Sequence, residues 1–382
     1  MQSSVMPTLE SSRARWLTWA AAAVALMLLP LLVQQLGSGW VRIMASALLY
    51  VLLALGLNIV VGYAGLLDLG FVAFYAVGAY MVALLNSPHL GEHFAWFAQH
   101  MPGGLHASIV LLIPAAAALA ALAGVLLGTP VLKLRGDYLA IVTLGFGEII
   151  RVFMNNLEQP VNITNGPRGL DRIDPVAIFG WNLGRPLDVP LPWGELRVAS
   201  VTLYCWLFLL LVVLSVLICR RLEDSRIGRA WMAIREDEIA ARAMGINTRN
   251  MKLLAFGMGA TFGGVSGAMF ASFQGFVSPE SFSLMESVMI VAMVVLGGLG
   301  HLPGVILGAL LLAALPEVLR YVAGDIQNLT GGRLDAAILR QLLIAVAMIA
   351  IMLLRPRGLW PTPEHGRSAL PSDAARQPGE AA

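Results

Sequence analysis

Apolar residues fill long stretches of this chain almost without interruption, and short polar segments separate the stretches. A helix that crosses a bilayer needs about 20 mostly apolar residues. The stretches that reach or approach this length lie at residues 16–36, 41–61, 66–85, 107–131, 138–157, 200–219, 253–273, 286–299, 304–323 and 336–354. The pattern predicts an all-α, polytopic integral membrane protein with about ten transmembrane helices. The third and eighth stretches are short or interrupted by glycine, so whether each crosses the membrane fully stays open.

The distribution of lysine and arginine predicts the orientation. With a cytoplasmic amino terminus, the cytoplasmic segments hold about sixteen basic residues and the outer segments about six, as the positive-inside rule requires. Residues 1–15 are then a cytoplasmic amino terminus, and residues 16–355 form the membrane domain with a cytoplasmic loop at 220–251. Residues 356–382 are a polar cytoplasmic tail that we expect to be disordered. Both termini are predicted to be cytoplasmic.

The composition excludes several other classes of protein. Of the 382 residues, 58% are hydrophobic and 13% are charged, and the net charge is only +2. Soluble proteins carry about 25% charged residues, and nothing in this chain is typical of a nucleic-acid-binding surface. The two cysteines lie in one apolar stretch and predict neither a disulfide framework nor a metal site. The chain lacks the phosphate-binding motif Gly-x4-Gly-Lys-Ser/Thr, so it does not hold ATP by that route. We expect no cofactor.

The most informative motif is Gly62-Tyr-Ala-Gly-Leu-Leu-Asp-Leu-Gly70, which joins two apolar stretches. Its glycines, Gly62, Gly65 and Gly70, interrupt the helix at or near membrane depth. Backbone that leaves the helix inside a bilayer must be buried in protein or line a wet cavity, because lipid cannot satisfy its polar groups. A carboxylate at such a depth is costly and is a candidate for function, so Asp68 is predicted to belong to a translocation path.

Three further polar residues in apolar stretches, Asn58, Thr143 and Glu148, are candidates for the same path. Asn58 and Thr143 are equally suited to hydrogen bonds between helices. Glu148 has Arg151 three residues further on, on the same helix face, so an ion pair within the helix explains it equally well.

Glycine recurs every fourth residue in two places, at Gly259, Gly263 and Gly267 and at Gly300, Gly304 and Gly308. This spacing predicts helices whose backbones approach closely. The region 297–304 is equally compatible with a tight turn at the inner surface.

The loop 220–251 is predicted to form an amphipathic helix outside the membrane. Ile227, Trp231, Ile234 and Ala241 recur at helical spacing, and Gly245 is suited to end the helix. Acidic residues stand among the arginines, whereas a helix that lies on lipid headgroups favours a mainly basic polar face. The loop therefore indicates a docking surface for a protein partner.

Two residues imitate the serine–histidine dyad of rhomboid intramembrane proteases. Ser266 and His301 lie on neighbouring predicted helices, and nucleophilic catalysis needs them within hydrogen-bond reach. The predicted topology instead puts Ser266 near the middle of a helix and His301 at the cytoplasmic surface. A protease and an ion-coupled secondary transporter remain as distant alternatives, and the charged loop 220–251 argues against both.

With these motifs identified, the chain resembles the membrane subunits of bacterial branched-chain amino-acid ABC importers, in particular the LivM-type permeases. The matching segments lie at 57–70 with 78–80, 134–151, 162–170, 225–230, 233–247 and 296–300. The resemblance implies a multi-pass permease of the inner membrane, surrounded by lipid. Its implied partners are two cytoplasmic ABC ATPase subunits, a second, homologous permease and a periplasmic substrate-binding protein.

Permeases of this kind dock on the ATPase through a cytoplasmic helix with a loose Glu-Ala-Ala-x3-Gly pattern. Here Ala240, Ala241 and Gly245 fit that pattern, but Ile239 occupies the acidic position and Glu238 lies one residue earlier. The residues expected to couple the permease to the ATPase are Ile227, Trp231, Arg235, Glu238, Ala240, Ala241 and Gly245.

The resemblance thus predicts the permease subunit of an ATP-driven importer of leucine, isoleucine and valine. Its partner subunits hydrolyse ATP, and the chain itself is not an enzyme. A permease of the same family for urea, amides or other amino acids is the alternative.

Overall fold

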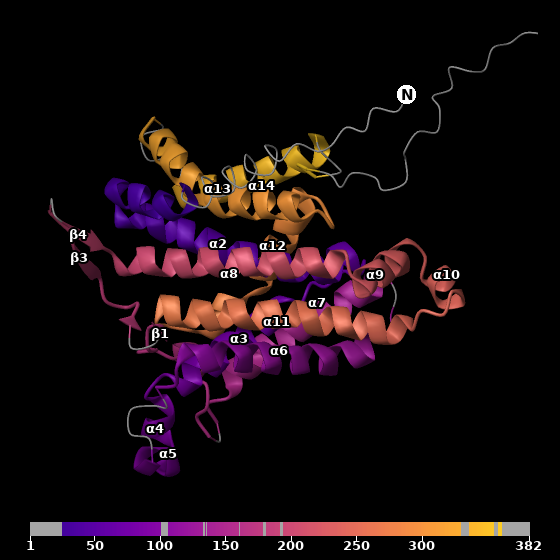
Figure 1. The fold of residues 1–382 in the computed structure, drawn as a ribbon, viewed down its shortest axis with the longest axis horizontal. Coiled ribbons are helices and arrows are strands. Elements are labelled where there is room, and N and C mark those ends of the chain that lie inside the picture. The colour runs from indigo at the N-terminus through magenta and orange to yellow at the C-terminus, as the bar shows by residue number, and fades with distance from the viewer. Residues whose placement is uncertain are drawn as a thin grey trace, which may run out of the picture.

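The computed structural model describes residues 25–100, 106–132, 134, 136–159, 161–178, 181–191, 194–329, 336–354 and 358–360. Within these residues the fold is a bundle of long helices that run roughly side by side (Figure 1). The helices are α2 (Ser38–Asn58) with the π-helical turn η1 (Ile59–Tyr63), α3 (Val72–Leu85), α6 (Ile109–Val131), α7 (Asp137–Asn156), α8 (Ser200–Glu223), α9 (Arg226–Glu236), α10 (Glu238–Ala243), α11 (Thr248–Gln274), α12 (Leu284–Gly297), α13 (Leu302–Leu329) and α14 (Ala336–Leu354).

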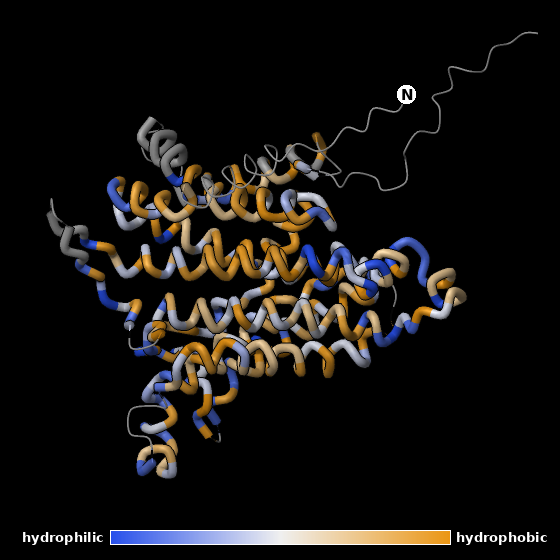
Figure 2. The backbone as a smooth tube through the Cα atoms, viewed as in Figure 1, coloured by the Kyte–Doolittle hydropathy of each residue, from blue (hydrophilic) through white to orange (hydrophobic). Residues whose placement is uncertain are grey.

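Six helical segments of the described chain are long and apolar enough to cross a membrane. They are Ser38–Tyr63, Ile109–Val131, Ser200–Glu223, Thr248–Gln274, Pro279–Gly297 and Leu302–Arg320. Apolar residues dominate the long helices, and polar residues concentrate at the two ends of the bundle (Figure 2). The prediction of an all-α, polytopic integral membrane protein is confirmed, whereas the count of ten crossings is not.

The first and third predicted stretches differ from simple spanning helices. A helix covers Ala25–Leu36 of the first stretch, and residues 16–24 lie outside the described part of the chain. The third stretch, predicted at 66–85, is helical only from Val72 to Leu85, which is 14 residues. At 1.5 Å per residue this helix is about 21 Å long, less than the roughly 30 Å of a bilayer core. The helix alone is therefore too short to cross the bilayer core.

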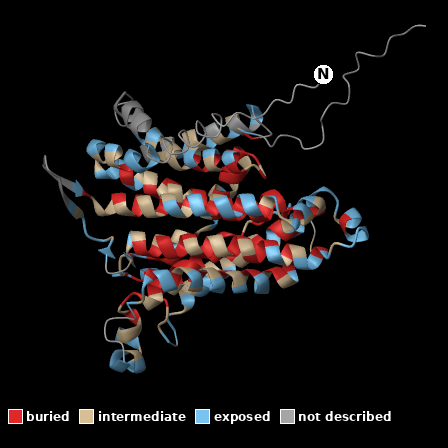
Figure 3. Cartoon of the chain, viewed as in Figure 1, coloured by how far each residue is buried: buried red, intermediate tan, exposed pale blue. Residues whose placement is uncertain are grey.

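The core of the bundle lies around α2, α3 and α11. Helix α11 packs against α6, α3 and α2. In α2 with η1, 72% of the residues in the apolar window are buried, against 28% in α6. The outer helices bury one face and expose the other (Figure 3). The exposed apolar faces of α6 and α8 are the faces that suit lipid.

The two ends of the bundle carry different structures (Figure 1). Helices α9 and α10 project at one end. The other end carries the short helices α4 (His89–His93) and α5 (Ala95–His100) and two antiparallel hairpins. Strand β1 (Ala177–Ile178) pairs with β2 (Trp181–Asn182), and β3 (Leu187–Leu191) pairs with β4 (Gly194–Val198).

The prediction of a single helix in the loop 220–251 is wrong, because the chain forms two helices that meet at Asp237. Asp237 has extended backbone angles, φ −153° and ψ 111°. Its carboxylate accepts hydrogen bonds from the backbone N–H of Ile239 and Ala240, at 2.7 and 3.0 Å. An aspartate that caps a helix in this way competes with helix continuation through its own position.

The predicted cytoplasmic terminus at 1–15 lies outside the described residues, as does most of the predicted tail at 356–382. Residues 358–360 of that tail are described, and they pack against the end of α12. The backbone N–H of Leu359 donates to the carbonyl of Leu296 at 2.8 Å, and Trp360 donates to Gly297 at 3.3 Å. The ordered chain thus extends at least to Trp360.

Candidate functional site

The segment between η1 and α3, residues 64–71, is non-helical and lies between α7 and α12. Its backbone polar groups bind side chains of these two helices. The N–H of Leu69 donates to Oγ1 of Thr143 on α7 at 3.0 Å, and Oγ of Ser287 on α12 donates to the carbonyl of Leu69. The protein thus supplies the hydrogen bonds that lipid cannot. We call residues 64–71 the broken segment.

Asp68 shapes the broken segment from within. Its Oδ1 accepts a hydrogen bond from the backbone N–H of Gly70 at 2.9 Å, the geometry of an Asx turn. The side chain is buried, and Oδ2 has no hydrogen-bond partner among the described residues. Asp68 and Thr143 line one cavity of about 10 Å³ together with Phe146 and Phe256. That cavity is too small for an amino acid, so the carboxylate is closed off in this conformation.

Asn58 serves a different contact. Its Oδ1 accepts a hydrogen bond from the backbone N–H of Gly300 at 2.9 Å, and its amide nitrogen is buried with no partner among the described residues. Asn58 therefore joins the end of α2 to the turn between α12 and α13. A Cβ added at Gly62 would overlap the Asn58 side chain and lie 2.8 Å from the nitrogen of Gly300.

Glu148 lies on α7 and pairs with Arg151, whose guanidinium also binds Glu280 of η3 (Pro279–Phe282) at 3.1 Å. The Glu148 side chain is 41% exposed. It faces an open groove of about 510 Å³ between α7 and the start of α12. The other residues that line this groove are Arg151, Ser283, Leu284, Met285 and Val288. The structure thus brings Asp68 and Thr143 together, and it places Glu148 at the open groove and Asn58 at the α12–α13 turn.

The first set of regularly spaced glycines faces α2 and α3. A Cβ at Gly259 would lie 3.1 Å from the carbonyl oxygen of Gly56, and one at Gly263 would lie 3.0 Å from Cβ of Phe74. A Cβ at Gly267 would overlap the carbonyl oxygen of Tyr75. These backbones approach closely because the glycines carry no side chain.

The second set divides between a turn and a helix. Gly300 lies in the turn with φ +81°, whereas Gly304 and Gly308 lie on α13 and pack against α12. A Cβ at Gly308 would lie 2.7 Å from Cα of Gly297. At the broken segment, a Cβ at Gly70 would overlap the carbonyl oxygen of Thr143.

Helices α9 and α10 form a hairpin, which we call the coupling hairpin, and its inner face holds it to α11. Trp231 is 0% exposed, and its Nε1 donates to the carbonyl of Met251 at 2.7 Å. Ala241 is also buried, and Ile227 is partly buried. Glu238 binds Lys252 at 2.8 Å and Arg242 at 3.1 Å. The contacts of Trp231 with Met251 and of Glu238 with Lys252 anchor the coupling hairpin to α11, whereas the pair of Glu238 with Arg242 lies within α10.

The outer face of the coupling hairpin carries exposed apolar residues, of which the sequence analysis named Ile239 and Ala240 but not Met244. Ile239 is 71% exposed and Met244 is 84% exposed, and Ala240 is exposed beside them. Gly245 has φ +87°, and the bonds from Gly245 N to Arg242 O and from Ile246 N to Ala241 O form a Schellman motif. A large apolar residue in a charged loop is the signal that would have drawn attention to Met244.

The structure does not bring Ser266 and His301 together as a catalytic dyad. Ser266 is buried in α11, and its hydroxyl donates to the carbonyl of Phe262 at 2.8 Å. The His301 ring instead forms a hydrogen bond with the carbonyl oxygen of Trp360 at 3.1 Å. Among the described residues, no group of three or more His, Cys, Asp or Glu side chains is arranged to hold a metal ion.

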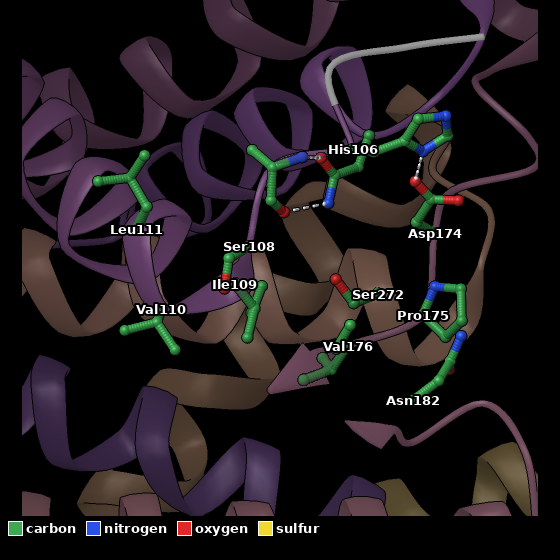
Figure 4. A pocket seen from close by; sticks show the side chains of 13 residues that line it. His106, Ser108, Ile109, Val110, Leu111, Asp174, Pro175, Val176, Asn182 and Ser272 are labelled. Atoms are coloured by element: carbon green, nitrogen blue, oxygen red, sulfur yellow. Dashed lines mark hydrogen bonds and ion pairs between the residues drawn. The ribbon is translucent and has the colours of Figure 1, made fainter. Parts of the chain in front are cut away.

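A larger cavity, of about 750 Å³, opens at the end of the bundle that carries α4 and the strands (Figure 4). Asn86 lines this cavity and forms two hydrogen bonds with the backbone of Ala107, at 3.2 and 3.0 Å. Nδ1 of His106 forms a hydrogen bond with the carboxylate of Asp174, and both residues line the cavity. None of the candidate path residues lines this cavity, so it is separate from the broken segment.

Long apolar helices packed around a broken segment that holds the buried Asp68, with a charged hairpin at one end of the bundle, define a polytopic membrane protein of the transport type. Comparison with known proteins identifies the family. The chain belongs to the family described as "Branched-chain amino acid transport system / permease component", which matches residues 39–352.

Individual relatives agree with this assignment. The chain is 40% identical over 367 residues to the high-affinity branched-chain amino acid transport system permease protein LivM of Escherichia coli, covering 94% of this chain and 78% of the relative. It is 25% identical over 331 residues to a probable LivM of Methanocaldococcus jannaschii, covering 82% and 90%. It is also 25% identical over 320 residues to the permease protein LivH of Escherichia coli, covering 82% and 92%. No solved structure matches the chain significantly.

Proposed function

We propose that this chain is the membrane subunit of an ATP-driven importer that carries leucine, isoleucine and valine inward across a bacterial inner membrane. The observation that carries the proposal is the 40% identity, over 94% of the chain, to a permease of branched-chain amino acid transport. Both termini are cytoplasmic in this proposal, in line with the distribution of basic residues. The alternative is a permease of the same family that carries urea, amides or other amino acids, so the identity of the solute is the point to be tested.

The coupling hairpin is the proposed docking site for one of the two ATPase subunits. Its inner face is taken up by Trp231, Ala241 and Glu238, which bind the membrane domain. Its outer face presents Ile239 and Met244, at 71% and 84% exposure. Exposed apolar residues rimmed by charges mark protein–protein contacts. Gly245 ends α10 directly after this outer face, with φ +87° and the two hydrogen bonds of the Schellman motif.

A second permease is the proposed partner at the face formed by α7 and the start of α12. Large apolar side chains of α7 are exposed there, namely Tyr138, Ile141, Ile149, Val152 and Phe153. The groove beside Glu148 opens on the same side. A partner that covers this face would enclose the groove and place the broken segment next to a path between the two permeases. The partner is a homologue or a second copy, and a periplasmic binding protein delivers the solute at the opposite end from the coupling hairpin.

In the proposed transport mechanism, differences in binding free energy between two conformations drive the solute across, because this chain does no chemistry on the solute. ATP binding and hydrolysis in the partners move the coupling hairpin, and helices that pack through glycine rock against one another to open each side in turn. A differential affinity of a few kcal/mol between the two states is enough to shift such an equilibrium strongly. The closed cavity at Asp68 is then one state of a segment that opens in the other.

Uptake in membrane vesicles tests the proposal. Vesicles with the chain and its partner subunits, supplied with the binding protein and ATP, should accumulate radiolabelled leucine. Unlabelled isoleucine and valine should compete, and urea and acetamide should not. Competition by urea or acetamide alone would move the solute to the alternative, and uptake that needs only an ion gradient would contradict the ATP-driven importer.

A further inference from the structure

Arg235 of α9 reaches into the membrane domain although its backbone lies on the coupling hairpin. Its Nη1 donates to the carbonyl oxygen of Gly62 at 2.5 Å, and the two residues are 173 positions apart in the chain. Gly62 lies in the π-helical turn η1, close to the carboxyl end of the helix that begins with α2. Carbonyl groups at a helix end have no partner within the helix, and a cation there is favourable. Arg235 therefore caps this helix end from outside.

The Arg235 side chain occupies a slot that two glycines leave open. A Cβ at Gly65, where φ is +67°, would lie 2.9 Å from Cγ of Arg235. A Cβ at Gly300, where φ is +81°, would lie 2.9 Å from Nη1 of Arg235. Gly65 belongs to the broken segment, and Gly300 belongs to the turn between α12 and α13. One side chain of the coupling hairpin thus touches both.

Two structural connections lead from Arg235 to Leu69, the neighbour of Asp68. The first runs along the chain from Gly62 through the broken segment itself. The second runs from Gly300 into α12, whose Ser287 donates a hydrogen bond to the carbonyl of Leu69. The N–H of Leu69 is held on the other side by Thr143 of α7. A displacement of α9 therefore acts on the backbone beside Asp68 from two directions.

Arg229, a second arginine of α9, makes no contact of this kind with the described part of the membrane domain and serves as a comparison. It lies six residues earlier on the same helix, is exposed like Arg235, and donates from Nη1 to the carbonyl of Asp224 at 2.7 Å. That contact is local and stays within the loop. Arg229 and Arg235 thus match in type, helix and kind of hydrogen bond, and they differ in what they connect.

We propose that Arg235 is a positioning residue that transmits movement of the coupling hairpin to the broken segment around Asp68. The inference rests on the proposed function, since it assigns the residue through which ATP-driven movement reaches the transport path. From the sequence, Arg235 is expected among the residues that couple the permease to the ATPase, and the inference adds the contact in the membrane domain through which it acts.

The test measures uptake and ATP hydrolysis in the same vesicles for Arg235→Ala, Arg235→Lys and the control Arg229→Ala. Arg235→Ala should still co-purify with the ATPases and hydrolyse ATP, while leucine taken up per ATP falls by roughly 5- to 150-fold, the usual range for coupling between sites. Arg235→Lys should recover part of the loss, because the ammonium keeps the charge and one donor. Arg229→Ala should match the wild type in both quantities.

Hydrogen exchange of the detergent-solubilised chain alone provides a second readout. Amides of residues 62–70 should exchange faster in Arg235→Ala than in the wild type, and Arg229→Ala should leave them unchanged. Unaltered uptake per ATP in Arg235→Ala, or unaltered exchange in this segment, would overturn the inference. Loss of ATPase co-purification in Arg235→Ala would show instead that the residue docks the partner. Absence of ATP-dependent uptake in the wild type would refute the proposed function, and the inference with it.

Discussion

Trp231→Ala should detach the coupling hairpin from the membrane domain without unfolding the bundle. The indole is fully buried and its Nε1 donates to the carbonyl of Met251. Truncation of a buried tryptophan to alanine costs about 3–5 kcal/mol. Since about 1.4 kcal/mol corresponds to a factor of ten, the open state of the coupling hairpin should become at least about 100-fold more populated. Trp231→Phe keeps most of the apolar contact and loses one hydrogen bond, at a cost of about 0.5–1.5 kcal/mol, so its effect should be about tenfold or less.

Hydrogen exchange of residues 226–243 measures this opening directly. The control is Met232→Ala, the next residue on the same helix, whose side chain is 38% exposed. Exchange should rise in the order Met232→Ala, Trp231→Phe, Trp231→Ala, and co-purification of the ATPases should fall in the same order. Equal exchange in Trp231→Ala and Met232→Ala would refute the anchoring role of the tryptophan.

Four further predictions follow from individual residues. Asp68→Asn should alter transport and leave co-purification unchanged, and wild-type uptake in this variant would reduce Asp68 to a packing residue. Gly267→Ala should destabilise the solubilised protein by about 1–3 kcal/mol, because its Cβ would overlap a carbonyl of α3. The control Gly145→Ala places its Cβ in open space and should not lower the melting temperature. Equal melting temperatures for the two variants would contradict the close packing at Gly267. Gly245→Val, at φ +87°, should strain the end of α10 and weaken ATPase association, and undiminished co-purification would count against docking there. Burial and a neighbouring histidine lower the pKa of His89 from 6.5, so the folded state binds this proton less readily than the unfolded state. The contribution of His89 to stability should be retained above pH 6.5 and lost as the pH falls through the lowered pKa. If the melting temperature of His89→Gln depends on pH as that of the wild type does, this reasoning is contradicted.

The helical content and the inner face of the coupling hairpin follow from periodicity. Trp231 and Ala241 recur at helical spacing, and both are buried. The break at Asp237 was not predicted, because the surrounding residues are good helix formers and the decisive contact is the capping bond that the aspartate itself makes. A cap inside a continuous amphipathic pattern gives only a weak sequence signal.

Around Asp68, the sequence predicts the break in the helix but not the contacts that hold the broken segment in place. Glycines and a carboxylate within an apolar region predict a break in the helix, and the helix does break there. That Thr143 and Ser287 satisfy the backbone of Leu69 depends on how α7 and α12 pack, which no local pattern encodes. The contact between Arg235 and Gly62 is of the same kind, since it joins residues that only the tertiary fold brings together.

The number of membrane crossings does not follow from the sequence alone, because an apolar stretch of a given length can adopt more than one structure. An apolar stretch such as 66–85 is long enough to span, but its first residues are non-helical and only Val72–Leu85 forms a helix. Whether a stretch is one helix or an extended passage plus a short helix depends on partners for its backbone, which neighbouring helices supply.

The most direct test of the central claim is a pulldown of the tagged chain in mild detergent, followed by mass spectrometry of the proteins that co-purify. The account predicts two cytoplasmic ATPase subunits and a second permease, with the ATPases lost when Ile239 and Met244 are both replaced by aspartate. Recovery of the chain alone, from membranes in which it transports leucine, would contradict the account.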